Sequence, residues 1–103
     1  MKKTLILFIA LNSFVLYSQT TAEDYFKIAN EKYQKRDYYG AIADLTKAIE
    51  INPNNGPTYD KRGQIKGLLK DHYGAIADFT KAVEINPKFQ SAYYNRGVSK
   101  GLL

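Results

Sequence analysis

The stretch YGAIADLTKAIEINP, residues 39–53, returns almost unchanged as YGAIADFTKAVEINP at residues 73–87. The offset is 34 residues, and 17 of the 34 positions in residues 22–55 are identical in residues 56–89. Residues 90–103 begin a third copy, which matches the start of the second at 7 of 14 positions. A repeat of this period predicts an array of similar helical units stacked on one another.

Each unit is predicted to hold two helices. Residues 22–35 and 38–51 both place apolar side chains at helical spacing. A turn is expected at Arg36-Asp37, and Pro53 ends the second helix because proline disfavours a helical conformation in the residue before it. The second unit is predicted to repeat this arrangement, with helices near residues 57–69 and 72–85, a turn at Lys70-Asp71 and a closing Pro87.

Small and aromatic residues recur one repeat apart. The small residues are expected to let two helices approach closely, and the aromatic rings to fill the gap beside them. The combined pattern resembles the tetratricopeptide repeat family. The residues that carry the resemblance are Tyr25, Tyr59 and Tyr93; Ala29, Gly63 and Gly97; Ala41 and Ala75; Leu45 and Phe79; Ala48 and Ala82; Pro53 and Pro87. The sequence departs from the family at Arg62 and Arg96, which replace the aliphatic residue that Ile28 supplies in the first copy.

The resemblance implies an all-α fold, a right-handed α-solenoid of stacked antiparallel helix pairs. The units would be residues 22–55, residues 56–89 and a truncated third unit, residues 90–103, that holds only its first helix. The resemblance also implies that the first helices line a concave groove. Carried onto this sequence, the groove residues are Phe26, Lys27, Asn30, Tyr33 and Gln34; Asp60, Lys61, Gln64 and Leu68; and Tyr94, Asn95, Val98 and Leu102.

This groove mixes aromatic, amide and charged groups, a composition suited to an extended peptide or a partner helix. Phe26, Tyr33 and Tyr94 are the expected contact residues, whereas Lys27 and Gln34 are equally consistent with a solvated surface. Some family members grip the C-terminal carboxylates of a partner with a fixed set of side chains. Only Asn30 matches that set, while Phe26, Lys61, Ser91 and Asn95 do not, so such a carboxylate clamp is not expected.

The first eighteen residues predict a signal peptide. Lys2 and Lys3 precede an apolar run over residues 5–17 that is shorter than the roughly 20 residues of a membrane span. Cleavage is expected after Ser18, with a cut after Ala22 or an uncleaved anchor as alternatives. The rest of the chain is therefore predicted to be periplasmic or secreted, with no membrane span after cleavage.

Composition and residue types argue against catalysis, cofactors and nucleic acid. There is no cysteine, and the net charge of +5 falls to +3 without Lys2 and Lys3, with basic residues interleaved with acids. The single histidine, His72, is expected at a surface turn without the partners of a metal site or triad. Asp44 and Asp78 are expected on the solvent side of the second helices. Asp37 and Asp71 fit turn or capping roles.

We therefore expect a non-catalytic module that binds a protein or peptide partner, without metal or cofactor. Two alternatives remain open at this stage. The chain could be a structural piece that self-associates into a homo-oligomer through its open C-terminal end, because about three repeats are needed for stability. It could also be the N-terminal fragment of a larger enzyme or sensor.

Overall fold

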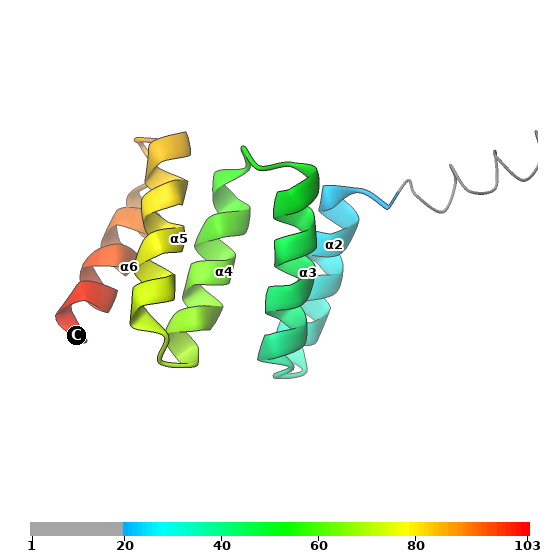
Figure 1. Ribbon diagram of the computed structural model, residues 1–103, viewed down its shortest axis with the longest axis horizontal. Coiled ribbons are helices and arrows are strands. Elements are labelled where there is room, and N and C mark those ends of the chain that lie inside the picture. Colours follow the sequence, from blue (N-terminus) through cyan, green and yellow to red (C-terminus); the bar gives the residue numbers. More distant parts are fainter. Residues whose placement is uncertain (1–19) are drawn as a thin grey trace, which may run out of the picture.

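The computed structural model describes residues 20–103, so the predicted signal peptide at residues 1–18 lies outside the described part. Residues 20–103 form five helices and no strands: α2 (Ala22–Gln34), α3 (Tyr38–Ile51), α4 (Gly56–Leu68), α5 (His72–Ile85) and α6 (Gln90–Gly101). The helices follow one another in chain order, each beside the next, as Figure 1 shows. The predicted all-α solenoid is confirmed. Within residues 20–103, no helix has the length and apolar character needed to cross a membrane.

Helix α2 begins with a reciprocal cap. The Thr21 hydroxyl accepts a hydrogen bond from the Asp24 backbone N–H at 3.1 Å, and the Asp24 carboxylate accepts one from the Thr21 N–H at 3.0 Å. The two bonds give partners to the backbone N–H groups of Thr21 and Asp24, which have no partner within the helix. The hydrogen bonds from Thr21, the backbone one first, hold the pKa of the Asp24 carboxyl below its usual value.

The turn inside each unit reverses the chain through one left-handed residue, Arg36 with φ 62° and Lys70 with φ 65°. The next residue, Asp37 or Asp71, donates its backbone N–H to the carbonyl five residues earlier at 2.9 Å, which closes the preceding helix. Its side chain then accepts from the N–H three residues later, at 3.0 Å in the first unit and 2.9 Å in the second. The predicted capping role of both aspartates is confirmed.

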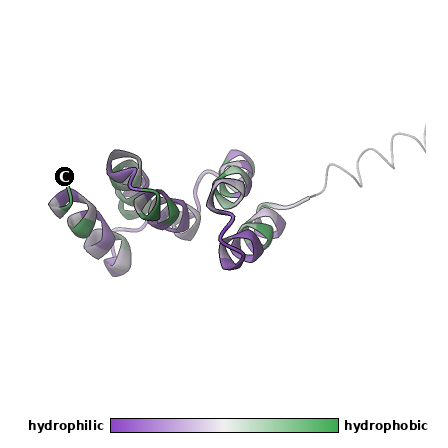
Figure 2. Cartoon of the chain, turned by 90° about the horizontal axis from the view of Figure 1, so that it is seen from below, coloured by the Kyte–Doolittle hydropathy of each residue, from purple (hydrophilic) through white to green (hydrophobic). Residues whose placement is uncertain are grey.

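The core consists of two clusters of mostly small buried side chains. Alanines at the helix crossings are at most 1% exposed and allow the backbones to approach closely. Each helix carries both apolar and hydrophilic residues (Figure 2), as expected for elements buried on one side. The first cluster is Ala29, Ala41, Leu45 and Ile65, and the second is Tyr59, Ala82, Val83 and Ala92.

In each unit a small residue of the first helix packs against a larger residue of the second helix, and the residue types differ between the units. In the first unit Ala29 and Leu45 share a cluster. In the second, Gly63 takes the place of Ala29 and Phe79 that of Leu45. A Cβ atom added to Gly63 would lie 2.8 Å from Cε1 of Phe79, closer than real Cβ contacts allow. The larger ring of the second unit therefore requires a residue without a side chain opposite it.

The prediction that Asp44 and Asp78 face solvent is wrong. Asp78 is only 4% exposed. Its carboxylate accepts two hydrogen bonds from Arg62, at 2.9 Å from Nε and 2.7 Å from Nη2, and lies 3.1 Å from Lys66 Nζ. Asp44 is half-buried and lies 2.8 Å from Lys32 Nζ. Both aspartates point toward the first helix of their own unit because that helix supplies the cation.

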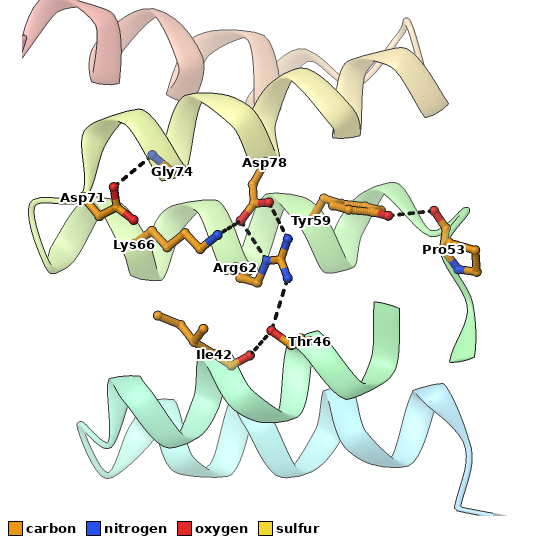
Figure 3. A network of polar contacts seen from close by, with 9 residues as sticks. All are labelled: Ile42, Thr46, Pro53, Tyr59, Arg62, Lys66, Asp71, Gly74 and Asp78. Carbon is orange, nitrogen blue, oxygen red and sulfur yellow. Dashed lines mark hydrogen bonds and ion pairs between the residues drawn. The ribbon is translucent and has the colours of Figure 1, made fainter. Parts of the chain in front are cut away.

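Arg62, Lys66 and Asp78 form what we call the ion-pair triad, shown in Figure 3. Arg62 also donates from Nη1 to the Thr46 hydroxyl at 3.2 Å, and thereby links α4 to the second helix of the preceding unit. The hydrogen bond to Asp78 raises the pKa of Arg62 above its usual value. Arg62, at which the sequence departs from the family pattern, thus joins the two units.

Candidate functional site

A pocket of about 260 Å³ opens where the first helices of the three units lie near one another. It collects side chains from α2, α4, α5 and α6, so residues far apart in the sequence share one surface. The lining residues are Tyr33, Gly63, Gln64, Gly67, Leu68, His72, Phe79, Asn95, Val98, Ser99 and Leu102. Both apolar and polar groups line it, as is usual for sites that bind a ligand.

One of the residues that line the pocket has no side chain. Gly67 stands one repeat after Tyr33, so the second unit has no ring where the first has one. A Cβ atom added to Gly67 would meet no heavy atom within 4 Å. The space next to Gly67 is therefore open.

A buried carboxylate orders two amide side chains beside the pocket. Asp60 is 6% exposed and accepts hydrogen bonds from Gln64 Nε2 at 2.7 Å and from Asn95 Nδ2 at 3.4 Å. The bond from Gln64 lies within α4, and the bond from Asn95 joins α6 to α4. With its nitrogen donating to Asp60, each amide keeps its oxygen as an acceptor for another group. A backbone N–H of a bound peptide is a suitable donor for such an oxygen.

His72 contributes a polar atom that has no partner within residues 20–103. Its Nδ1 is enclosed and makes no hydrogen bond there. The residue follows the turn directly, as expected, but it is half-buried and lines the pocket instead of lying free on the surface. A buried imidazole nitrogen gains free energy from any hydrogen bond that a ligand offers.

Apolar side chains complete the pocket rim. Leu68 is 55% exposed, Val98 45% and Leu102 62%, although all three are aliphatic. Next to them Lys61 places its Nζ 3.9 Å from the centre of the Tyr33 ring, a cation–π contact that holds this ring in place. Exposed aliphatic side chains beside ordered polar groups form a surface suited to binding.

The structure brings together part of the predicted groove. Tyr33, Gln64, Leu68, Asn95, Val98 and Leu102 line the pocket, and Lys61 and Asp60 contact lining residues. Phe26, Lys27, Asn30, Gln34 and Tyr94 are not among the lining residues. Phe26 packs on the first core cluster, whereas Tyr94 is 73% exposed on α6.

Gly63, Gly67, His72, Phe79 and Ser99 are lining residues that the sequence reasoning missed. The change from Tyr33 to Gly67 at one repeat position was the available indication of a pocket. Within residues 20–103, no three histidine, aspartate or glutamate side chains gather where they could hold a metal ion.

A protein-family comparison matches the tetratricopeptide repeat to residues 22–55 and again to residues 56–89. The chain belongs to the tetratricopeptide repeat family. A search of curated proteins found no match.

Several solved structures superpose on this chain. The first TPR of Spaghetti (RPAP3), bound to the HSP90 peptide SRMEEVD, is 26% identical with a TM-score of 0.76, over 79% of this chain and 64% of that one. MamA is 30% identical with a TM-score of 0.79, over 89% and 56%. The TPR2B domain of yeast Sti1 in its pHsp70 complex is 29% identical with a TM-score of 0.74, over 77% and 63%. This chain spans less than two thirds of each of these structures.

Proposed function

We propose that this chain binds an extended peptide segment of a partner protein in the groove lined by α2, α4 and α6. The observation that carries the proposal is the pocket itself, in which aliphatic side chains lie beside two oriented amides. Apolar side chains of a peptide fit the space above Gly67, and its backbone N–H groups can donate to Gln64 and Asn95. Peptide recognition commonly combines the burial of apolar side chains with hydrogen bonds to the peptide backbone.

The structural relatives support a protein-interaction role. The Spaghetti domain is bound to an HSP90 peptide, and the Sti1 domain is in a complex with pHsp70. The fold is typical of non-catalytic interaction modules. The partner of this chain differs in chemistry, however, because only Asn30 matches the side chains with which family members grip a C-terminal carboxylate. An internal, partly apolar peptide segment suits the groove better than an acidic C-terminus.

The proposed place of action is the periplasm or the cell exterior. This part of the proposal rests on the sequence of residues 1–18, in which a basic start precedes a short apolar run. It determines where a partner should be sought, namely among proteins of the cell envelope or secreted proteins.

A substitution that fills the groove tests the proposal. Gly67→Gln adds a side chain where nothing lies within 4 Å, so the fold tolerates it while the groove closes. The matched control is Gly97→Gln, which has the same free space but is not a lining residue. Wild type, variant and control are each immobilised and exposed to an envelope extract, and captured proteins are identified by mass spectrometry.

We expect Gly67→Gln to lose partners that wild type and Gly97→Gln both capture. Peptides tiled across a captured partner should then bind wild type with at least tenfold higher affinity than Gly67→Gln, whereas SRMEEVD should not bind. Equal capture by wild type and Gly67→Gln would show that partners bind elsewhere on the molecule.

A further inference from the structure

The first unit contains a three-part contact around an aromatic ring. The Tyr33 ring, near the end of α2, lies against the Tyr38 ring at the start of α3, with 5.8 Å between the ring centres and an angle of 52° between the ring planes. Lys61 of α4 places its Nζ 3.9 Å from the centre of the Tyr33 ring. This ring is therefore held by the second helix of its own unit and by the first helix of the next unit.

The second unit has the two flanking residues of this contact but lacks the ring. The flanking residues, one repeat after those around Tyr33, are His72 at the start of α5 and Asn95 on α6. Gly67 stands at the position of Tyr33, and a Cβ atom added to it would meet no heavy atom within 4 Å. Gly67, His72 and Asn95 all line the pocket. By the repeat, the open space beside Gly67 corresponds to the place of the Tyr33 ring in the first unit.

The remaining walls of the pocket suit an aromatic ligand group. Tyr33 and Phe79 add two rings to the lining, and aromatic rings attract one another in offset or edge-to-face arrangements. The amides of Gln64 and Asn95 donate their nitrogens to Asp60, so their oxygens can accept a hydrogen bond from a phenolic hydroxyl. A tyrosine side chain thus finds both ring contacts and an acceptor in the pocket.

The groove also carries positive charge that a ligand can use. Among the groove residues predicted from the sequence, Lys27 and Lys61 are cations one repeat apart, and Asp60 is the one acid. Asp60 is 6% exposed and already accepts two hydrogen bonds, so its charge is directed inward. Lys61 forms no ion pair with a carboxylate of residues 20–103. Charge complementarity therefore favours an acidic group in the ligand near Lys61.

We propose that the pocket selects an aromatic side chain of the bound peptide, whose ring lies between His72 and Asn95 above Gly67. This inference rests on the proposed peptide-binding function and names the residue type that the groove prefers. Lys61 precedes Gly67 by six residues, which is about 9 Å along a helix. An extended peptide covers that distance in two to three residues. The preferred segment therefore has an acidic residue two or three positions from its aromatic residue.

The heptapeptide acetyl-Ser-Glu-Ser-Tyr-Ser-Glu-Ser-amide is the probe, because its two acids serve either direction of the bound peptide. Its binding to the chain is followed by NMR, and we expect saturable shifts of the Gly67 and His72 amide signals. The same peptide with leucine in place of tyrosine should bind about fivefold more weakly, since it lacks the ring contacts. With glutamine in place of both glutamates, affinity should fall about threefold at low salt. That difference should vanish for Lys61→Gln.

Restoring the ring within the chain gives a second test, which needs no ligand. Gly67→Tyr should place the chain's own ring in the pocket, so that the probe no longer binds. The ring contact with His72 should also raise the thermal midpoint by about 4 °C. In a His72→Ala background this gain should fall to less than half. The comparison separates ring packing from the general benefit of replacing a glycine in a helix.

Two results with the unaltered chain would refute the inference, and they remain decisive if a variant does not fold. One is equal affinity for the tyrosine and leucine probes, and the other is absence of binding of the tyrosine probe up to about 1 mM. A thermal gain from Gly67→Tyr that His72→Ala leaves unchanged would also contradict it.

Peptides of a captured partner distinguish this inference from the proposed function. A peptide that loses binding to Gly67→Gln, yet keeps its affinity for wild type when its aromatic residues are replaced by leucine, would show that the groove binds peptides and that the aromatic preference is wrong. Equal capture of partners by wild type and Gly67→Gln would instead refute the proposed function, and this inference with it.

Discussion

At the scale of single residues, the ion-pair triad shows how much depends on one departure from the repeat. Where Ile28 stands in the first unit, the second has Arg62, and this arginine takes both oxygens of a buried carboxylate. The pattern alone placed Asp78 on the solvent side, because an aspartate next to an apolar stripe usually marks the polar face of a helix. The arginine substitution one repeat after Ile28 was the indication that a buried acid needed a partner.

Replacing each aspartate by asparagine should show how much each of the two ion pairs contributes to the free energy of unfolding. Asp78→Asn leaves two partly buried cations facing each other, and we expect a loss of about 2 kcal/mol in the free energy of unfolding. Asp44→Asn is the matched change in the first unit, where a single lysine is released at a more exposed site, and its cost should be clearly smaller. Urea denaturation of both variants measures the difference, and equal losses would mean that Arg62 adds nothing.

At the scale of elements, the helix boundaries were largely predictable because prolines and aspartates mark them. The predicted second helices, residues 38–51 and 72–85, coincide with α3 and α5, and α4 begins one residue before its predicted start. The pocket between the helices was not predicted. Groove positions were carried over from the family pattern, which does not show that Gly67 removes a ring or that Phe26 packs into the core.

The turns inside the units offer an element-scale test. Arg36 adopts a left-handed conformation, which costs a residue with a side chain about 1 kcal/mol relative to glycine. We therefore expect Arg36→Gly to raise the free energy of unfolding by about 0.5–1 kcal/mol. Its neighbour Lys35 has φ −85°, so Lys35→Gly is the control and should give no gain. A gain from both substitutions, measured by thermal melting, would show that the backbone conformation is not the cause.

At the scale of the whole molecule, stability is distributed unequally along the array. Helix α4 has neighbours on both sides, since it packs against α3 and α5, whereas α6 packs mainly on α5. In repeat proteins each unit gains most of its stability from such neighbours.

Hydrogen exchange followed by NMR should reveal this gradient. Amides of α6 should exchange about tenfold or more faster than those of α4, although both are first helices with related sequences. Equal protection of α4 and α6 in the free chain would indicate that the described helices unfold as one cooperative unit.

The link from Arg62 to Thr46 also bears on how this architecture can be lengthened by design. In this chain the second unit follows the first under two conditions: its first helix finds a hydroxyl behind it, and its second helix brings a ring to its glycine. Residues 56–89 satisfy both conditions for a further copy of themselves, because they carry Thr80 as well as Arg62, Gly63 and Phe79. Residues 22–55 do not, since Ile28 would leave that hydroxyl without its donor. The second unit is therefore the natural building block for longer arrays, and tandem copies of it should join in a single orientation and order.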